Sequence, residues 1–271
     1  MAFKICFMVD RTETNEQGAI APMQKAVTVP KKSVVQVRFP GRGTALAYYN
    51  DQFDLHEGDL VYVDGKLEGI QGRVVDVSYN FKIKVSEYKK VIAVVDTQVK
   101  GELFMAGSHF VTFDANVLPY SKVLSWFKAP DKEDEEYASG NDDSAFPLSN
   151  LNQLKVSAAI AERGQNYYLE NKVRYLCING TQGKAIVEGT ETYEVEFCYQ
   201  DGQMSNLICD CFCTYHCKHE VAAMLQLRET LELIEKHYPD RIAESGYFAA
   251  IYKPTVFLYA IDSKETGSIV L

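Results

Sequence analysis

A cluster of sulfur and imidazole side chains is the most reactive feature of this 271-residue chain. Residues 208–220 read ICDCFCTYHCKHE and hold four cysteines and two histidines within 13 positions. Such a cluster can bind a metal ion, form disulfides or carry redox chemistry on a thiol. The spacing of its members favours the first of these.

The cluster contains two short pairs of metal-ligand residues. Residues two apart in an extended chain project to the same side, so Cys209 and Cys211 point together from the end of a predicted strand. Cys217 and His219 have the same spacing where a helix begins, and both can converge at that junction. Zinc prefers four thiolate or imidazole ligands in a tetrahedron, and a helix N-terminus favours a nearby thiolate. The pairs therefore predict a Zn²⁺ site.

The other chemistries fit the sequence less well. The chain shows no signal peptide and no apolar run long enough to cross a membrane, which predicts a cytoplasmic protein, where disulfides are rare. A redox pair would usually read Cys-x-x-Cys. A catalytic zinc would leave one ligand position open beside an acid or base, so we keep a metalloenzyme only as a minor alternative and expect no enzyme activity.

Predicted secondary structure leads the chain into the cluster. A helix with an apolar periodicity begins after Ser149 or Asn150, and Gly164 is expected to end or bend it. A second helix follows Cys217 and ends before Pro239. Between the helices, four segments read as strands of an antiparallel meander: residues 173–180, 184–189, 192–199 and 204–211.

These residues resemble a known family. The pattern Cys-x-Cys followed by Cys-x-His at a helix start, after a meander and the segment RGQNYYLENKVRYL, is similar to the SWIM zinc finger over about residues 150–237. The phrase CKHEVA also matches this family. The resemblance implies a module that binds DNA or protein, and it implies four zinc ligands: Cys209, Cys211, Cys217 and His219.

The cluster departs from the SWIM pattern in its loop. The loop FCTYH is short for the family, and Phe212 stands where a proline often follows the first pair. Cys213 and His216 are surplus donors, and either could replace a ligand, with Cys213 the stronger rival because it continues the alternation from Cys211.

The rest of the chain predicts an α+β protein of two domains. Short Val- and Tyr-rich segments separated by Gly, Pro, Asn and Asp predict strands and a small β-barrel-like domain: KSVVQVRF, TALAYYN, GDLVYVDG, GRVVDVSY and KIKVSEY. The run GDLVYVDG…GIQGRVVDV resembles SH3-like or KOW-like barrels. An acidic segment predicts a flexible linker. The expected order is a barrel-like domain over 1–127, a linker over 128–147, and a SWIM-like domain of helix, β-meander, zinc knuckle and helix over 148–271.

The predicted function is a zinc module that binds DNA or another nucleic acid as part of a larger complex. A net charge of −9 requires any such surface to be local. Candidate contacts near the finger are Arg163, Lys172, Arg174 and Lys218. Candidates in the first domain are Lys31, Lys32, Arg38, Arg42, Lys82, Lys84, Lys89 and Lys90. The alternative is a protein–protein adaptor, which the acidic balance favours; no small-molecule substrate and no membrane partner are evident.

Overall fold

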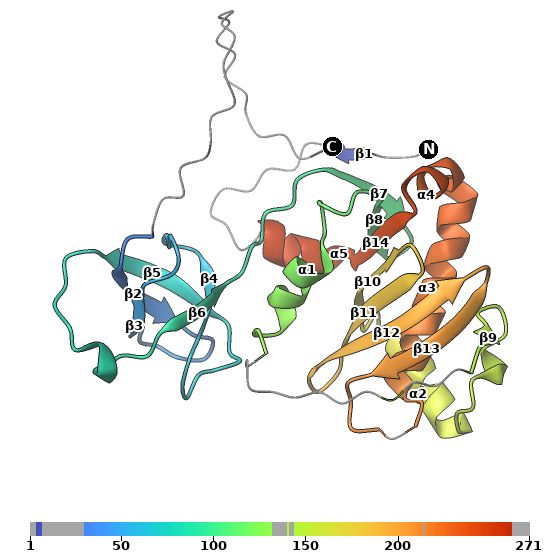
Figure 1. Ribbon diagram of the computed structural model, residues 1–271, viewed down its shortest axis with the longest axis horizontal. Helices are drawn as coiled ribbons and strands as arrows, with labels where there is room; N and C mark the ends of the chain where they lie inside the picture. Colours follow the sequence, from blue (N-terminus) through green and yellow to red (C-terminus); the bar gives the residue numbers. More distant parts are fainter. Residues whose placement is uncertain (1–3, 7–29, 132–139, 141–143, 214, 262–271) are drawn as a thin grey trace, which may run out of the picture. The chain divides into compact units, whose positions relative to one another are not determined.

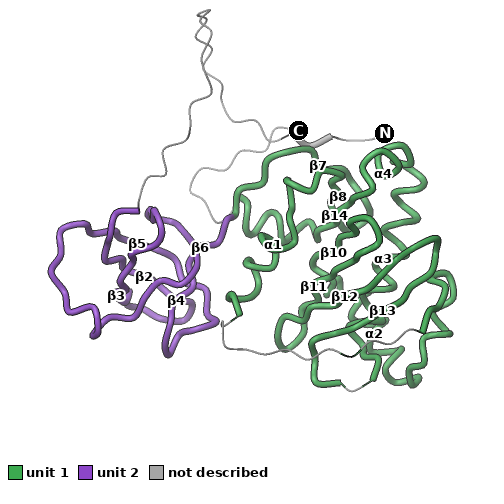
Figure 2. The backbone as a smooth tube through the Cα atoms, in the orientation of Figure 1, with its two compact units in different colours: residues 1–7, 97–271 green, residues 8–96 purple. Residues whose placement is uncertain are grey.

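The chain forms two compact units. The computed structural model describes residues 4–6, 30–131, 140, 144–213 and 215–261. One unit comprises residues 1–7 and 97–271 and the other residues 8–96 (Figure 2). The sequence interpretation placed the first boundary after residue 127, whereas the units divide between Asp96 and Thr97. Residues 97–127 therefore belong to the unit that carries the cysteine cluster.

The unit of residues 8–96 contains a five-stranded antiparallel sheet in the order β3-β2-β5-β4-β6. Its strands are β2 Ser33–Arg38, β3 Leu46–Asn50, β4 Leu60–Val63, β5 Gly72–Ser78 and β6 Val91–Val94. Alternate residues of β2 are buried, as the period of two predicts. The predicted strand KIKVSEY is wrong, because this segment is a loop with one 3-10 turn, η1 (Val85–Glu87).

The pairing does not close this sheet into a barrel. A single isolated bridge joins Tyr49 of β3 to Lys90, just before β6, beyond the paired strands. The expected small barrel is therefore not confirmed, while the antiparallel sheet and its core of Val, Leu, Tyr and Phe side chains are.

The other unit contains a nine-stranded antiparallel sheet (Figure 1) in the order β1-β7-β8-β14-β10-β11-β12-β13-β9. Its strands are β1 Lys4–Cys6, β7 Glu102–Ala106, β8 His109–Thr112, β9 Phe146–Pro147, β10 Val173–Asn179, β11 Gln182–Glu188, β12 Thr192–Gln200, β13 Gln203–Cys209 and β14 Tyr247–Tyr252. The predicted meander is confirmed as β10 to β13. Strand β14 lies between β8 and β10, which joins residues 97–127 to the meander.

Helices complete this unit. They are α1 Tyr120–Phe127, η2 Leu151–Gln153, α2 Ala158–Leu169, α3 Lys218–His237, α4 Pro239–Ser245, α5 Lys253–Val256 and the π-helical turn η3 Phe257–Ile261. Helix α3 packs on the meander strands and buries Met224, Leu227 and Ile234 in the core. Among the helices that the structure describes, none has the length and apolar character that a bilayer crossing requires.

The first helix of the predicted SWIM-like domain begins later than expected. Its N-cap is Ser157, whose hydroxyl accepts the backbone N–H of Ile160 at 3.3 Å, rather than Ser149 or Asn150. Gly164 does not end α2, which continues to Leu169. A Cβ atom there would lie 2.5 Å from Val221, so the missing side chain lets α2 and α3 approach closely.

Two predicted segments fall largely or wholly outside the described residues. They are the acidic linker, most of which is not described, and the C-terminal GSIVL, whose apolar sequence predicts an edge strand. The last predicted linker residues, Phe146 and Pro147, form β9, which pairs with β13. The end of that segment is therefore part of the sheet.

Candidate metal centre

Two elements bring four donor side chains together. Cys209 is the last residue of β13, and Cys211 lies two residues further along the chain. Cys217 is the N-cap of α3, and His219 lies in the first turn of that helix. One donor atom from each of these residues lies within 4.8 Å of all the others. The four residues are therefore close enough to hold a metal ion.

The distances suit a tetrahedral ion. The Nδ1 atom of His219 is 3.6 Å from the Sγ of Cys209 and 3.7 Å from the Sγ of Cys217. A tetrahedral zinc with usual Zn–S and Zn–N bond lengths would separate sulfur and nitrogen by about 3.6 Å. Nδ1 is thus the imidazole nitrogen that faces the sulfur atoms.

Two tyrosine rings hold the imidazole of His219. The ring of Tyr193 is stacked on it, with centroids 4.0 Å apart and planes at 17°, and Tyr167 contacts it at 5.5 Å. His219 is 3% exposed, and its Nε2 atom is buried without a hydrogen-bond partner in the described structure. Metal-binding histidines usually donate their second N–H to an acceptor. Here aromatic packing fixes the ring instead.

The start of α3 fixes Cys217. The carboxylate of Glu220, which is 4% exposed, accepts the backbone N–H of Cys217 at 2.8 Å. The same Oε2 atom is 3.0 Å from Nδ1 of His216. The backbone N–H of Glu220 in turn donates to the side chain of Cys217. These two bonds between Cys217 and Glu220 form a capping box, which orients the first turn of the helix and the cysteine before it.

The two surplus donors lie outside the group of four. His216 contacts Glu220 rather than the thiols. Cys213 is exposed, and its backbone N–H hydrogen bonds with Cys211. The geometry therefore groups the four residues that the SWIM resemblance implies.

The thiols compete for negative charge. The thiol of Cys209 hydrogen bonds to Cys217 and lowers the pKa of Cys217 to about 4, while the same interaction raises the pKa of Cys209. Burial raises the pKa of Cys211 to about 12. Three thiolates at this separation repel one another, so a cation is needed to hold all of them deprotonated, and a bound metal ion does this.

A hydrogen-bonded network fastens the first cysteine pair to α1. The Oδ1 of Asp210 accepts the backbone N–H of Glu194 at 2.9 Å. The Nζ of Lys128, just after α1, lies 2.8 Å from Glu194 and 3.7 Å from Asp210, and the hydroxyl of Tyr120 donates to Glu194 at 2.6 Å. The sequence analysis missed these contacts, since Tyr120 and Lys128 carry no spacing signal that links them to the cluster.

The loop between the ligand pairs exposes two aromatic side chains. Phe212 is 98% exposed and Tyr215 is 84% exposed. Both lie between Cys211 and Cys217, so a metal ion bound to those cysteines would anchor the loop at both ends. This loop, residues 212–216, is called the knuckle loop below.

The predicted nucleic-acid contacts do not form a single free basic group. Arg174 pairs with Glu188 at 3.0 Å and also lies over the ring of Tyr252, 4.9 Å from its centroid. The ammonium group of Lys218 lies 4.5 Å from the ring centroid of Tyr167. Lys172 is half-buried and Arg163 is exposed. Two of the four are thus engaged in contacts within the chain.

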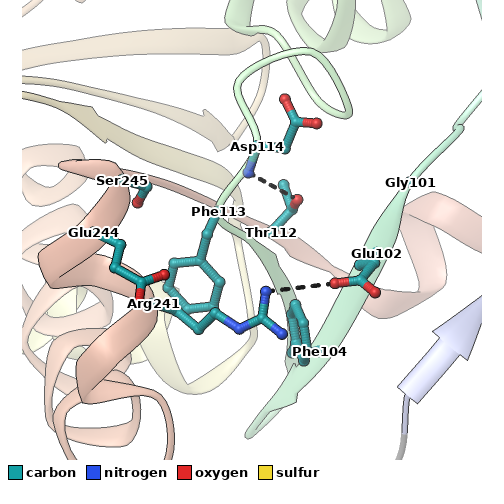
Figure 3. Close-up of a pocket in the computed structure, with 9 residues that line it drawn as sticks. All are labelled: Gly101, Glu102, Phe104, Thr112, Phe113, Asp114, Arg241, Glu244 and Ser245. Carbon is teal, nitrogen blue, oxygen red and sulfur yellow. Dashed lines mark hydrogen bonds and ion pairs between the residues drawn. The ribbon is translucent and has the colours of Figure 1, made fainter.

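A separate pocket of about 480 Å³ lies between strands β7 and β8 and helix α4 (Figure 3). Arg241 reaches across it to Glu102, at 3.6 Å, and its guanidinium lies over the ring of Phe104. Glu244 and Asp114 add two further carboxylates to the lining. Three carboxylates and one guanidinium line this pocket, so its mixed charge does not favour the binding of an anion or of a simple cation.

The chain was compared with known proteins. No protein-family model, no curated protein and no solved structure matches it. The resemblance to the SWIM finger therefore rests on the sequence motif of the cluster and the segments around it.

Proposed function

We propose that the unit carrying the cysteine cluster is a zinc-binding, non-enzymatic module of the SWIM type, which acts by binding a partner macromolecule. The observation that carries the proposal is the grouping of Cys209, Cys211, Cys217 and His219, with donor atoms within 4.8 Å of one another. Three thiolates and one imidazole are a donor set that zinc favours, and hard cations such as Mg²⁺ prefer oxygen.

The same donor set supports a structural role for the metal. Four protein ligands complete a tetrahedron and leave no position for a substrate or an activated water. Glu220, the buried carboxylate beside the cluster, already accepts the Cys217 backbone N–H and contacts His216. It is therefore engaged in the helix cap rather than available as a general base.

The metal would join the end of β13 to the start of α3, two elements that the knuckle loop links in sequence and that also pack together in the core. Cys209 and Cys211 extend from β13, whereas Cys217 and His219 begin α3, the long helix that covers the meander. Apparent zinc binding in small sites is worth about 10–16 kcal/mol, which is comparable to the stability of a domain. Loss of the ion would therefore release the start of α3 from the sheet.

The knuckle loop is the part of the module best suited to contact a partner. Exposed aromatic side chains such as Phe212 and Tyr215 are unusual on a free surface and are common at the centres of protein interfaces. A loop held at both ends by metal ligands loses little conformational entropy when it binds. These features favour a protein partner.

Nucleic acid is the second candidate partner for this module, because exposed aromatic rings can stack on bases. The local charges favour it less. Arg174 and Lys218 are engaged within the chain, and residues 148–237 contain more acidic than basic side chains. We therefore place the protein partner first.

The metal part of the proposal can be tested by reconstitution of the full chain. Metal is removed with a chelator under reducing conditions, and backbone hydrogen exchange is followed in β13 and the first turns of α3. We expect exchange to quicken there, zinc or cobalt to restore protection, and magnesium to have no effect. Bound cobalt should show the strong visible absorption of a tetrahedral thiolate site. Unchanged protection after metal removal would contradict a structural role.

The proposal that the knuckle loop contacts a protein partner is tested with a variant that keeps all four metal-ligand residues. A protein with Phe212→Ala and Tyr215→Ala is compared with the wild type as bait for cross-linking in extracts, with and without nuclease. We expect proteins that cross-link to the wild type alone and survive nuclease treatment. Loss of the difference after nuclease treatment would favour nucleic acid instead.

A further inference from the structure

The second unit has an end that is rich in lysine. Strand pairing places the start of β2, the end of β3 and the end of β5 together, since Ser33 pairs with Asn50 and Val34 pairs with Ser78. The loop of residues 79–90 leaves β5 at this end and returns beside β3, where the backbone N–H of Tyr49 donates to the carbonyl of Lys89. The residues that follow are called the lysine face: Lys31, Lys32, Tyr79, Lys82, Lys84 and Lys89.

Most of the cations on this face have no anionic partner. Lys31, Lys32, Lys82, Lys84 and Lys89 are all exposed. In the described part of the chain, only Lys84 among them forms an ion pair, with Glu87 at 3.1 Å. This pattern differs from the other unit, where the candidate cations Arg174 and Lys218 are engaged.

The lysines at this end outnumber the acids near them. Asp51 pairs with Lys90 at 3.0 Å and Glu87 pairs with Lys84 at 3.1 Å. The carboxylate of Asp64 accepts the backbone N–H of Lys90, while Asp54 and Asp76 are exposed. With Lys90, six lysines stand against these five acids, so the local balance is positive although the chain as a whole carries −9.

An aromatic ring lies within the lysine face. Tyr79 is 51% exposed and directly follows β5, and the ammonium group of Lys31 lies 6.0 Å from its ring centroid. Phe81, two residues on, packs edge-on against Tyr49 at 6.2 Å, which anchors the loop to β3. The ring of Tyr79 is thus exposed on a loop that is held to the sheet.

We infer that the lysine face binds single-stranded nucleic acid, with phosphates at the lysines and a base stacked on Tyr79. Lysines supply the phosphate contacts, and a tyrosine beside them supplies the sequence-tolerant stacking that single-strand binders use. A duplex keeps its bases stacked on one another and offers no free base to Tyr79, so the single strand fits better. This binding lies outside the metal centre and does not depend on it.

Fluorescence anisotropy of labelled 20-nucleotide single strands tests the inference, with full-length protein at about 50 mM and about 200 mM salt. Three proteins are compared: wild type, Tyr79→Ala, and the double variant Lys82→Gln with Lys89→Gln. A matched control removes two exposed lysines of the other unit, Lys100→Gln with Lys236→Gln. Circular dichroism checks that each protein is folded.

We expect binding that weakens with salt, falls about tenfold in Tyr79→Ala, and falls in the lysine double variant while the control binds as the wild type does. Binding should also persist in Cys217→Ser, which separates this inference from the zinc proposal. No binding at low salt, equal binding of a duplex, or equal losses in the control would each overturn the inference. Binding to anionic lipid vesicles that is lost in the same variants, without binding to the oligonucleotide, would assign the face to membranes instead.

Discussion

The imidazole of His219 lies flat on the ring of Tyr193, with centroids 4.0 Å apart and planes at 17°. This contact sets the direction of Nδ1, which faces Cys209 and Cys217 at 3.6 and 3.7 Å. A ring held before the metal arrives reduces the entropy lost on binding. In the proposed metal site, the stack would take the place of the hydrogen bond that usually orients a metal-binding histidine.

Removing the Tyr193 ring should weaken metal binding without unfolding the protein. We expect Tyr193→Ala to lower zinc affinity roughly tenfold, the lower end of the range for residues that orient metal ligands. Tyr193→Phe is the matched control, since it keeps the stacked ring and loses only the hydroxyl contact with Thr190. Competition with a chromophoric chelator measures both affinities. Equal affinity of the alanine and wild-type proteins would show that the stack does not position His219.

Cys217 and Cys213 should differ sharply in their effect on stability. Cys217 is 1% exposed and belongs to the group of four, whereas Cys213 is exposed outside it. We expect Cys217→Ser to abolish backbone protection in β13 and the first turns of α3 in hydrogen exchange of the full chain, because a structural metal is lost. Protection of β2 to β6 in the other unit should remain. The backbone amides of the Cys213→Ser protein should exchange at the wild-type rate. An equal loss of protection in both variants would mean that Cys213 is also needed to bind the metal.

The close approach of α2 and α3 predicts a steric clash at Gly164. A Cβ atom there would lie 2.5 Å from Val221 and 3.0 Å from the carbonyl of Lys218. We expect Gly164→Ala to lower the free energy of unfolding by about 1–3 kcal/mol, as overpacking does. Gly43→Ala is the control, since nothing lies within 4 Å of that position. Adding Val221→Ala to Gly164→Ala should recover part of the loss in urea unfolding, and strict additivity of the two changes would argue against the clash.

His109 should make this unit sensitive to mild acid. It is fully buried, its Nε2 is 2.9 Å from the carbonyl of Val173, and burial lowers its pKa from 6.5 to about 4. Between these two values the unfolded chain binds a proton that the folded chain does not, so stability falls as the pH drops below 6.5. At about pH 5 the loss is roughly 2 kcal/mol relative to neutral pH.

Urea unfolding at neutral pH and at about pH 5 measures this loss in wild type and in His109→Gln. The variant lacks the titrating group, so the stability gap between the two proteins should narrow at the lower pH. Any acid release of metal affects both proteins alike. Parallel losses in the two proteins would mean that another group causes the pH dependence.

The strands and the helix around the cysteine cluster could be predicted because short sequence patterns determine them. The alternation of apolar residues located β10 to β13, and the periodicity after Cys217 located α3. The metal-ligand group could be predicted because its members lie within 11 positions, Cys209 to His219, at the junction of two such elements. In zinc sites of this kind, the ligand residues recur at short, characteristic spacings that can be recognised in a sequence.

Contacts between distant segments left no such pattern. Strand β14 lies between β8 and β10, so residues 97–127, which were assigned to the first domain, belong with the unit that carries the cysteine cluster. Lys128, assigned to the linker, contacts Glu194 of the same unit. The Val- and Tyr-containing segment KIKVSEY, residues 82–88, predicted a strand from its composition, but this loop has no partner strand among the described residues and leaves Val85 46% exposed. Propensity without a neighbouring strand does not make a sheet.

The proposed structural zinc ion at Cys209, Cys211, Cys217 and His219 can be measured by elemental analysis of the full chain, purified under reducing conditions without chelators. Cys211→Ser and Cys213→Ser are the informative pair of variants. We expect about one zinc per chain in the wild type and in Cys213→Ser, and much less in Cys211→Ser. A zinc content near zero in the wild type, or one unchanged in Cys211→Ser, would contradict the proposal.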